Sequence, residues 1–331
     1  MKKITKITAA LLVAVIPLVS FSCKHNNNNI EENGKSEPPV EVIPDDAMRY
    51  WQSSSTATEW SVYGVEDLEK LAEVVNGGNA LAGVTITQKK DIVINEKVLS
   101  DDFKEPAEGA EAGTPNPNLK NLDSIGTGKD IENDNPFSGT YDGQGKIISG
   151  LYMYQGHQGL GLFGFVEEAV IKNVILIDSC VINKNVKLGT RADDPHDSDD
   201  DDRFGGLIGV IGASEDSETP TEIINCLFVG VVGSKVAKDR GSPYEYIGGM
   251  VGRADADATA KDCFAFARIY GSHADAFCGR HKNSSTGYEY FPLTARDNVN
   301  GDGKGEEISD FDEDVAAEIA EAIKAVKANV Q

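Results

Sequence analysis

The sequence predicts an all-β protein built as a stacked β-solenoid, and three observations carry the prediction. Apolar tetrapeptides bracketed by glycine recur at Gly161–Gly164, Gly206–Gly209 and Gly249–Gly252, so their first glycines lie 45 and 43 residues apart. Each is followed by a short β-rich run bounded by Gly, Asn or Asp, which is typical of strands and turns. A fixed period of this length is typical of stacked repeats, whose units bury their apolar faces against one another. At roughly 20 residues per coil, we expect each repeat to supply two coils.

Alignment of the three repeats produces two columns of equivalent positions. The first is polar and comprises Asn173, Asn225 and Asp262. The second is small to medium apolar and comprises Val174, Cys226 and Cys263. We expect the polar column to lie in turns, where such side chains bond local backbone and tolerate left-handed geometry. The apolar column is expected to point inward.

The residues of the repeat also carry a resemblance to a known family. Phe137–Leu151, with its Tyr-Asp-Gly-Gln-Gly turn, together with Gly161–Gly164 and Ile171–Val174, resembles the GLUG-motif repeat of bacterial surface proteins. The resemblance covers about residues 60 to 271. It implies a right-handed parallel β-helix at the cell surface and no chemistry, since the repeats are accessory even in IgA-peptidase-like members. Those peptidases need a His-Glu-x-x-His zinc motif, which this sequence lacks.

The N-terminal segment is predicted to be a lipoprotein signal peptide, residues 1–22. Three lysines precede an apolar run that is too short to span a membrane as a mature helix. The run ends at Ser22 and Cys23, which resemble a lipobox and imply lipidation of Cys23. The alternative is an ordinary signal peptide with an incidental cysteine. Residues 23–46 are polar and contain prolines, so we expect a disordered tether that holds the folded part off the membrane.

The net charge and the predicted signal peptide limit the environment and the partners that we expect. The formal net charge of -23 repels phosphate, so nucleic-acid binding is not expected, whereas divalent cations or basic partners suit such a surface. The signal predicts attachment to the bacterial outer membrane through the lipid, with the chain on the cell surface.

The solenoid is assigned to residues 47–290 and begins with a helix. Apolar spacing over Val65–Val75 predicts a short helix that caps the open end, with a partner-binding helix as the alternative. Alternation predicts strands at Val84–Thr87 and Asp91–Ile94, and Asp101–Pro117 is expected to be an inserted loop. Residues 184–203 carry seven aspartates and are expected to form a solvated loop, or else a loop that binds a cation or a partner.

Residues 291–331 are predicted to contain a turn that resembles a calcium loop, followed by a helix. The candidate ligands Asn298, Asn300 and Asp302 have the spacing of hard oxygen ligands around one ion, and the fourth candidate, Asp310, lies one place later than the twelfth position of such loops. The bidentate glutamate of such loops is missing, so a plain Gly/Asn turn is the alternative. The apolar stripe over Val315–Val330 predicts an amphipathic helix, expected to pack on the end of the solenoid as its second cap.

The cysteines and histidines suggest little chemistry. With two coils per repeat, Cys226 and Cys263 would lie about 9.5 Å apart, which is beyond the reach of a disulfide. Both are therefore interpreted as small buried hydrophobes, as is Cys180, while the role of Cys278 stays open. A group of residues close together in the sequence could supply zinc ligands or be incidental. It comprises His273, Asp275, Cys278 and His281.

The sequence therefore predicts a non-enzymatic, adhesin-like surface lipoprotein that binds a host or neighbouring-cell macromolecule, either protein or glycan. No row of carboxylates or bases follows the coils, and Asp142 is interpreted as a turn residue. The alternatives are a carbohydrate-binding or polysaccharide-degrading β-helix and a structural envelope protein.

Overall fold

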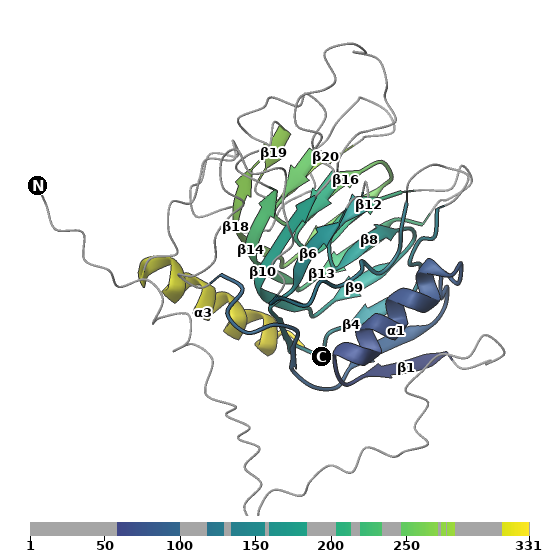
Figure 1. Ribbon diagram of the computed structural model, residues 1–331, viewed down its shortest axis with the longest axis horizontal. Coiled ribbons are helices and arrows are strands. Elements are labelled where there is room, and N and C mark those ends of the chain that lie inside the picture. Colours follow the sequence, from purple (N-terminus) through teal and green to yellow (C-terminus); the bar gives the residue numbers. More distant parts are fainter. Residues whose placement is uncertain are drawn as a thin grey trace, which may run out of the picture.

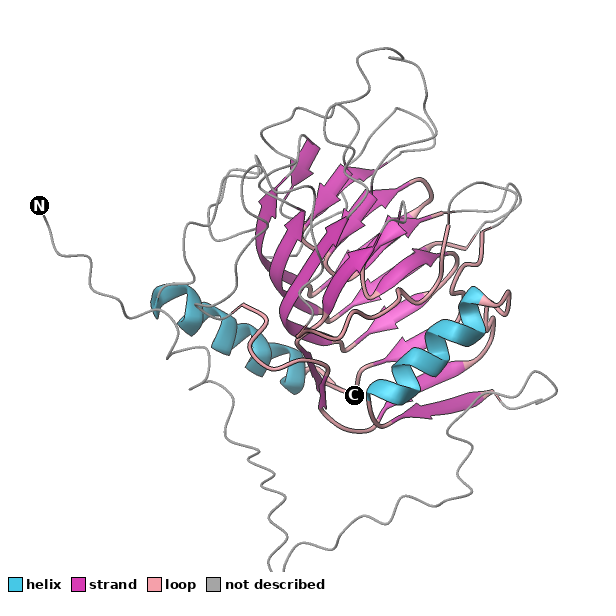
Figure 2. Cartoon of the chain, in the orientation of Figure 1, coloured by secondary structure: helices cyan, strands magenta, loops and turns pink. Residues whose placement is uncertain are grey.

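The protein consists mainly of parallel β-strands arranged in four sheets (Figures 1 and 2). The computed structural model describes residues 58–99, 118–128, 134–155, 159–183, 203–212, 219–233, 246–270, 273–275, 277–281 and 313–330. Sheet 1 contains, in order, β1 (Glu59–Val62), β2 (Thr85–Gln88), β4 (Thr140–Asp142), β9 (Val170–Lys172), β13 (Thr221–Ile224) and β17 (Ala258–Lys261). Sheet 2 contains β3 (Ile92–Val93), β5 (Ile147–Ser149), β10 (Ile175–Asn183), β14 (Leu227–Gly233) and β18 (Phe264–Tyr270), and β6 (Tyr152–Gln155) also pairs with β10.

The other two sheets have four strands each. Sheet 3 contains β7 (Gly159–Leu160), β11 (Arg203–Gly205), β15 (Tyr246–Gly248) and β19 (His273–Asp275). Sheet 4 contains β8 (Phe163–Val166), β12 (Ile208–Ile211), β16 (Val251–Ala254) and β20 (Cys278–His281). The predicted strands at Val84–Thr87 and Asp91–Ile94 are confirmed as β2 and β3, whereas 101–117 lies outside the described residues.

The chain visits the four sheets in turn, and we call one such passage a coil. Within the described residues, four coils pass through all four sheets: β4 to β8, β9 to β12, β13 to β16 and β17 to β20. Glu222 of β13 pairs directly with Val170 of the preceding coil and Thr259 of the following one. Each sequence repeat is therefore one coil, and the prediction of two coils per repeat was wrong. The period is long because residues 184–202 and 234–245 join strands within single coils.

The interior between the sheets is apolar and continuous along the coils. One aromatic cluster lies near its N-terminal part, where the ring of Phe163 is 5.3 Å from Phe137 and 5.4 Å from Tyr141 between centroids. Every residue of β14 is buried, because its inward side chains face this core, its outward Leu227 and Val229 meet a second apolar cluster, and Val231 meets a third. Such two-sided burial explains the unbroken hydrophobic run of this strand.

The predicted N-terminal helix is confirmed as α1 (Val65–Asn76). It connects the parallel neighbours β1 and β2, and Figure 1 shows it at the β1 end of the sheets. Leu68, Leu71 and Val75 are fully buried in the main core cluster. The apolar face that the helical period predicts is therefore the face that packs on the core. Buried Asp67 accepts a hydrogen bond from the Tyr63 backbone N–H at 2.8 Å, just before the first turn.

The predicted C-terminal helix is also confirmed, as α3 (Glu313–Ala328), but its position differs from the expected end cap. Val315, Ile319 and Val326 pack against the outward side chains of β10, β14 and β18, so the helix lies across the outer face of sheet 2 (Figure 1). The reason is that these strands expose an apolar outer row, and this row buries the helical stripe along the side of the coils. Neither described helix has the length and apolarity needed to cross a membrane.

Candidate functional site

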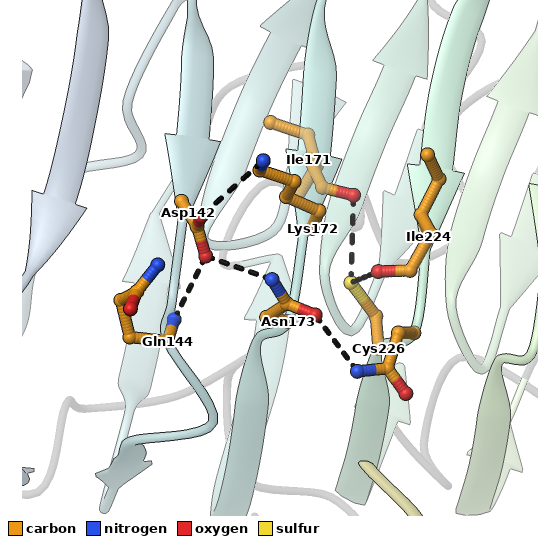
Figure 3. A network of polar contacts seen from close by, with 8 residues as sticks. Asp142, Gln144, Ile171, Lys172, Asn173, Ile224 and Cys226 are labelled. Carbon is orange, nitrogen blue, oxygen red and sulfur yellow. Dashed lines mark hydrogen bonds and ion pairs between the residues drawn. The ribbon is translucent and has the colours of Figure 1, made fainter. Parts of the chain in front are cut away.

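A buried row of polar side chains joins three consecutive coils at the corner between sheets 1 and 2 (Figure 3). The Asn173 side-chain amide donates to Asp142 Oδ1 at 2.9 Å, and the Asn225 amide donates to Asn173 Oδ1 at 2.8 Å. Asp142, Asn173 and Asn225 are each at most 6% exposed. We call these three residues the polar ladder. Buried polar groups of this kind must be hydrogen-bonded, and here the partners come from neighbouring coils.

The backbone geometry of the ladder agrees with the predicted turn column. Asn173, Asn225 and Asp262 have φ angles of 57°, 54° and 55°, in the left-handed region that Asn and Asp tolerate best. The side-chain amides of Asn173 and Asn225 reach the preceding coil, however, and not only local backbone as expected. The following column is also confirmed, because Val174, Cys226 and Cys263 are completely buried in the core.

Asp142 is a structural turn residue, as the sequence predicts. Its Oδ1 accepts the Gln144 backbone N–H at 3.0 Å, and its Oδ2 lies 3.3 Å from the ammonium of Lys172 (Figure 3). Burial acts to raise the pKa of this carboxyl, but the hydrogen bonds from Asn173 and Gln144 and the charge of Lys172 outweigh it. The net pKa therefore lies below its ordinary value, and the group is held as a carboxylate.

The C-terminal helix ends on this same ladder. Asn225 donates to the backbone carbonyl of Val326 at 2.9 Å, and Asn329 donates to Asn225 Oδ1 at 3.5 Å. Carbonyls in the last turn of a helix lack their usual partner four residues on, and the Val326 carbonyl accepts both the Asn329 backbone N–H at 3.2 Å and the Asn225 amide. The ladder thus positions α3 as well as the coils.

A half-buried acid ties the segment after β3 to sheet 2. Asp178 accepts backbone N–H groups from Val98 at 2.9 Å and Leu99 at 2.8 Å. Burial raises the pKa of Asp178 in spite of these hydrogen bonds. The contacts hold Val98 against Tyr152, Tyr154 and Cys180 in a third apolar cluster, so this acid also serves the fold.

The outer face of sheet 1 is the most extensive polar surface that the strand register defines. Two outward rows run across its six strands, and both carry hydroxyls and charges. The first row is Glu59, Thr85, Thr140, Val170, Glu222 and Thr259. The second row is Ser61, Thr87, Asp142, Lys172, Ile224 and Lys261. Eleven of these residues are half-buried or exposed, Asp142 being the buried one, so the rows are accessible on the sheet surface.

The glycines of the tetrapeptides serve close packing between sheets 3 and 4. A methyl group at Gly252 would lie 2.6 Å from the Gly209 carbonyl oxygen and 2.6 Å from the Phe204 backbone nitrogen. At Gly209 it would lie 2.5 Å from the backbone nitrogen of Leu160. Backbone approaches backbone here, so only glycine fits, as at other close approaches. The repeat-structural glycines are Gly161, Gly164, Gly206, Gly209, Gly249 and Gly252, and none of them has a positive φ.

The predicted lipidation and metal residues are not brought into one site by the described structure. Cys23, Asn298, Asn300, Asp302 and Asp310 lie outside the described residues, as does most of the acidic loop. His273 and His281 belong to β19 and β20, and Cys278 is buried. Within the described ranges, no three His, Cys, Asp or Glu side chains are grouped to hold a metal ion.

Two members of the repeat were missed by the sequence reasoning. Phe277–Gly279 continues the tetrapeptide column, since Cys278 pairs with Val251 and the Phe277 carbonyl accepts the Met250 N–H at 3.0 Å. Ser124–Gly126 precedes the Gly161–Gly164 member at the other end of the column, and Ile125 forms a parallel β-bridge with Phe163. Both retain only the second glycine, so a search that requires two glycines does not find them.

No protein-family model, no curated protein and no solved structure matches this chain. The candidate site is therefore defined by the chain's own geometry.

Proposed function

We propose that this protein is a non-enzymatic surface lipoprotein whose coils form a right-handed β-solenoid of the GLUG type and bind a macromolecule of a host or neighbouring cell. The observation that carries the proposal is the outer face of sheet 1, where six parallel strands align hydroxyl and charged side chains in two rows. A flat, repetitive polar face suits an extended partner, because equivalent groups recur at the strand spacing of about 4.8 Å.

The roles of Asp142 and Asp178, whose pKa values are shifted, support an interaction protein over an enzyme. Asp142 and Asp178 are both engaged in hydrogen bonds that join neighbouring segments, and Asp142 is held ionised beside Lys172. Perturbed acids at an active site would instead face a cleft with a free approach for substrate. In the proposed molecule α1 closes the first coil, and the lipidated Cys23 and the polar segment up to residue 46 link the solenoid to the outer membrane.

Two measurements test the location. Proteinase K treatment of intact cells should degrade the chain, and a Cys23→Ser variant should lose both lipid labelling and membrane attachment. Protection on intact cells with degradation after lysis would contradict the surface location and favour a periplasmic envelope role. Lipid labelling that persists in Cys23→Ser would contradict the anchor.

The binding face is tested by matched charge reversals. Glu222→Lys alters the half-buried first row of sheet 1, whereas Glu321→Lys alters an exposed position on α3 by the same charge. We expect Glu222→Lys to reduce binding of the purified chain to intact host or neighbouring cells by roughly tenfold, as loss of one charged contact would. Equal binding by both variants would exclude sheet 1 as the face, and binding restricted to purified glycans would favour the carbohydrate-binding alternative.

A further inference from the structure

Two buried cysteines lie side by side in consecutive coils. Ile224 pairs with Lys261 on one side of them, and Leu227 pairs with Phe264 on the other, so Cys226 and Cys263 are in register. Backbone hydrogen bonds bracket the pair, from Asn225 N–H to the Lys261 carbonyl and from Phe264 N–H to the Cys226 carbonyl, both at 2.8 Å. The one-coil repeat therefore removes the separation that the sequence reasoning had used against a disulfide.

The distance between neighbouring strands suits a disulfide. Adjacent parallel strands lie about 4.8 Å apart, within the range of roughly 4.4 to 6.8 Å that disulfides require between Cα atoms. Both thiols also lie on the inner side of the same turn, since Cys226 Sγ is 3.3 Å from the Ile224 carbonyl and Cys263 Sγ is 3.3 Å from the equivalent Lys261 carbonyl. The two side chains therefore leave the backbone in equivalent directions from adjacent coils.

The other described cysteines have no such neighbour. Cys180 pairs with Tyr152 and Val231, and Cys278 pairs with Val251. Among the described cysteines, only Cys226 and Cys263 thus occupy equivalent positions of adjacent coils, and the remaining two serve as internal controls.

We propose that Cys226 and Cys263 form a disulfide. It would join the turn that follows β13 to the turn that follows β17, the fifth and sixth strands of sheet 1. The proposal rests on the export that the proposed function requires, because disulfides persist in oxidising compartments. The oxidant is a protein or small-molecule disulfide. One cysteine thiolate attacks it to form a mixed disulfide, and the second cysteine thiolate displaces the reduced carrier. The two thiols lose two protons and two electrons, and the carrier disulfide becomes two thiols.

The bond must form while the chain is folding. Both cysteines are completely buried, so a carrier cannot reach them in the finished coil. Burial and the neighbouring thiol of Cys263 also raise the pKa of Cys226, which keeps it as the unreactive thiol after folding. Once formed, the bond is expected to resist reductants until the chain unfolds.

The test counts thiols in the full chain. The purified chain is unfolded, reduced, and refolded in a glutathione redox buffer, then alkylated under denaturing conditions and digested for mass spectrometry. We expect a peptide that links Cys226 to Cys263, with Cys180 and Cys278 alkylated. Chain that is refolded under reducing conditions should have a Tm lower by roughly 5 to 10 °C, as loss of a loop-closing disulfide would give in a chain of this size.

Two double variants and the chain from cells complete the test. Cys180→Ala with Cys278→Ala should still form the link, whereas Cys226→Ala with Cys263→Ala should keep every remaining thiol free. Full alkylation of Cys226 and Cys263 in a correctly refolded wild-type chain would overturn the proposal, whether or not the variants fold. A link that forms in the refolded chain and is absent from chain isolated from cells would support the pairing geometry and count against export, so the two failures are distinguishable.

Discussion

The side-chain amide of Asn225 donates a hydrogen bond at 2.8 Å to the side-chain oxygen of Asn173 in the preceding coil. The same amide donates to the Val326 carbonyl of α3 at 2.9 Å. One buried residue therefore connects two coils and the C-terminal helix, and this connection makes several consequences measurable.

Replacement of Asn225 should destabilise the fold strongly. Asn225→Ala leaves the Asn173 oxygen and the Val326 carbonyl without this donor, and it places alanine at a φ of 54°. We expect a loss of about 2 to 4 kcal/mol in the free energy of unfolding, measured by urea denaturation. Asn225→Gly retains the left-handed turn and should lose less than Asn225→Ala. Equal losses would show that the left-handed geometry contributes nothing, and a loss below about 0.5 kcal/mol for both would contradict the ladder.

The Asp142 carboxylate should make stability depend on pH in the acid range. Because its folded pKa lies below the unfolded value of about 3.9, its contribution is complete above that value. The contribution is lost as the pH falls through the folded pKa. Asp142→Asn should therefore cost about 1 to 2 kcal/mol at pH 7 and flatten the curve of stability against pH on the acid side of the unfolded pKa. Asp255→Asn is the control, because the Asp255 side chain is 29% exposed in its pair with Arg253 against 8% for that of Asp142, and it should cost less than about 1 kcal/mol.

The close approach of sheets 3 and 4 should make Gly252 intolerant of any side chain. Gly252→Ala would place a methyl group 2.6 Å from both the Gly209 oxygen and the Phe204 nitrogen. We expect a loss of about 3 kcal/mol or more, or failure to fold, measured by thermal unfolding. Gly64→Ala is the matched control, because nothing lies within 4 Å of its added methyl and its φ is -167°. A stable, unaltered Gly252→Ala protein would show that the two sheets are further apart.

The outer face of sheet 2 should become exposed when α3 is released. Val326→Asp places a charge in the cluster that contains Leu227 and Phe266. We expect the helix to undock and the outer face to bind a dye specific for exposed apolar surface, with faster amide exchange in α3. Lys324→Asp, at a position that is 71% exposed, places the same aspartate side chain in solvent, with a larger change of net charge, and should leave dye binding unchanged. Unchanged dye binding in Val326→Asp would show that α3 does not cover this face.

Much of the candidate site was visible in local sequence patterns. Asn173, Asn225 and Asp262 were predicted as turn residues, because a left-handed backbone position in a turn favours Asn and Asp in every repeat. The partners of the ladder were not visible, since the bond from Asn225 to Asn173 spans 52 residues and the bond to Val326 spans 101. Hydrogen bonds between coils depend on register, and no local pattern records them.

The sequence by itself determined the β-rich repeat, the two columns of its turns and both helices, because glycine spacing, turn residues and the helical apolar period act within a few residues of one another. Only the tertiary structure decided that one repeat makes one coil, that α3 lies along the side of sheet 2, and that Cys226 adjoins Cys263. The physical reason is that strands pair through register, and segments such as 184–202 and 234–245 lengthen the sequence between two strands without separating them in space.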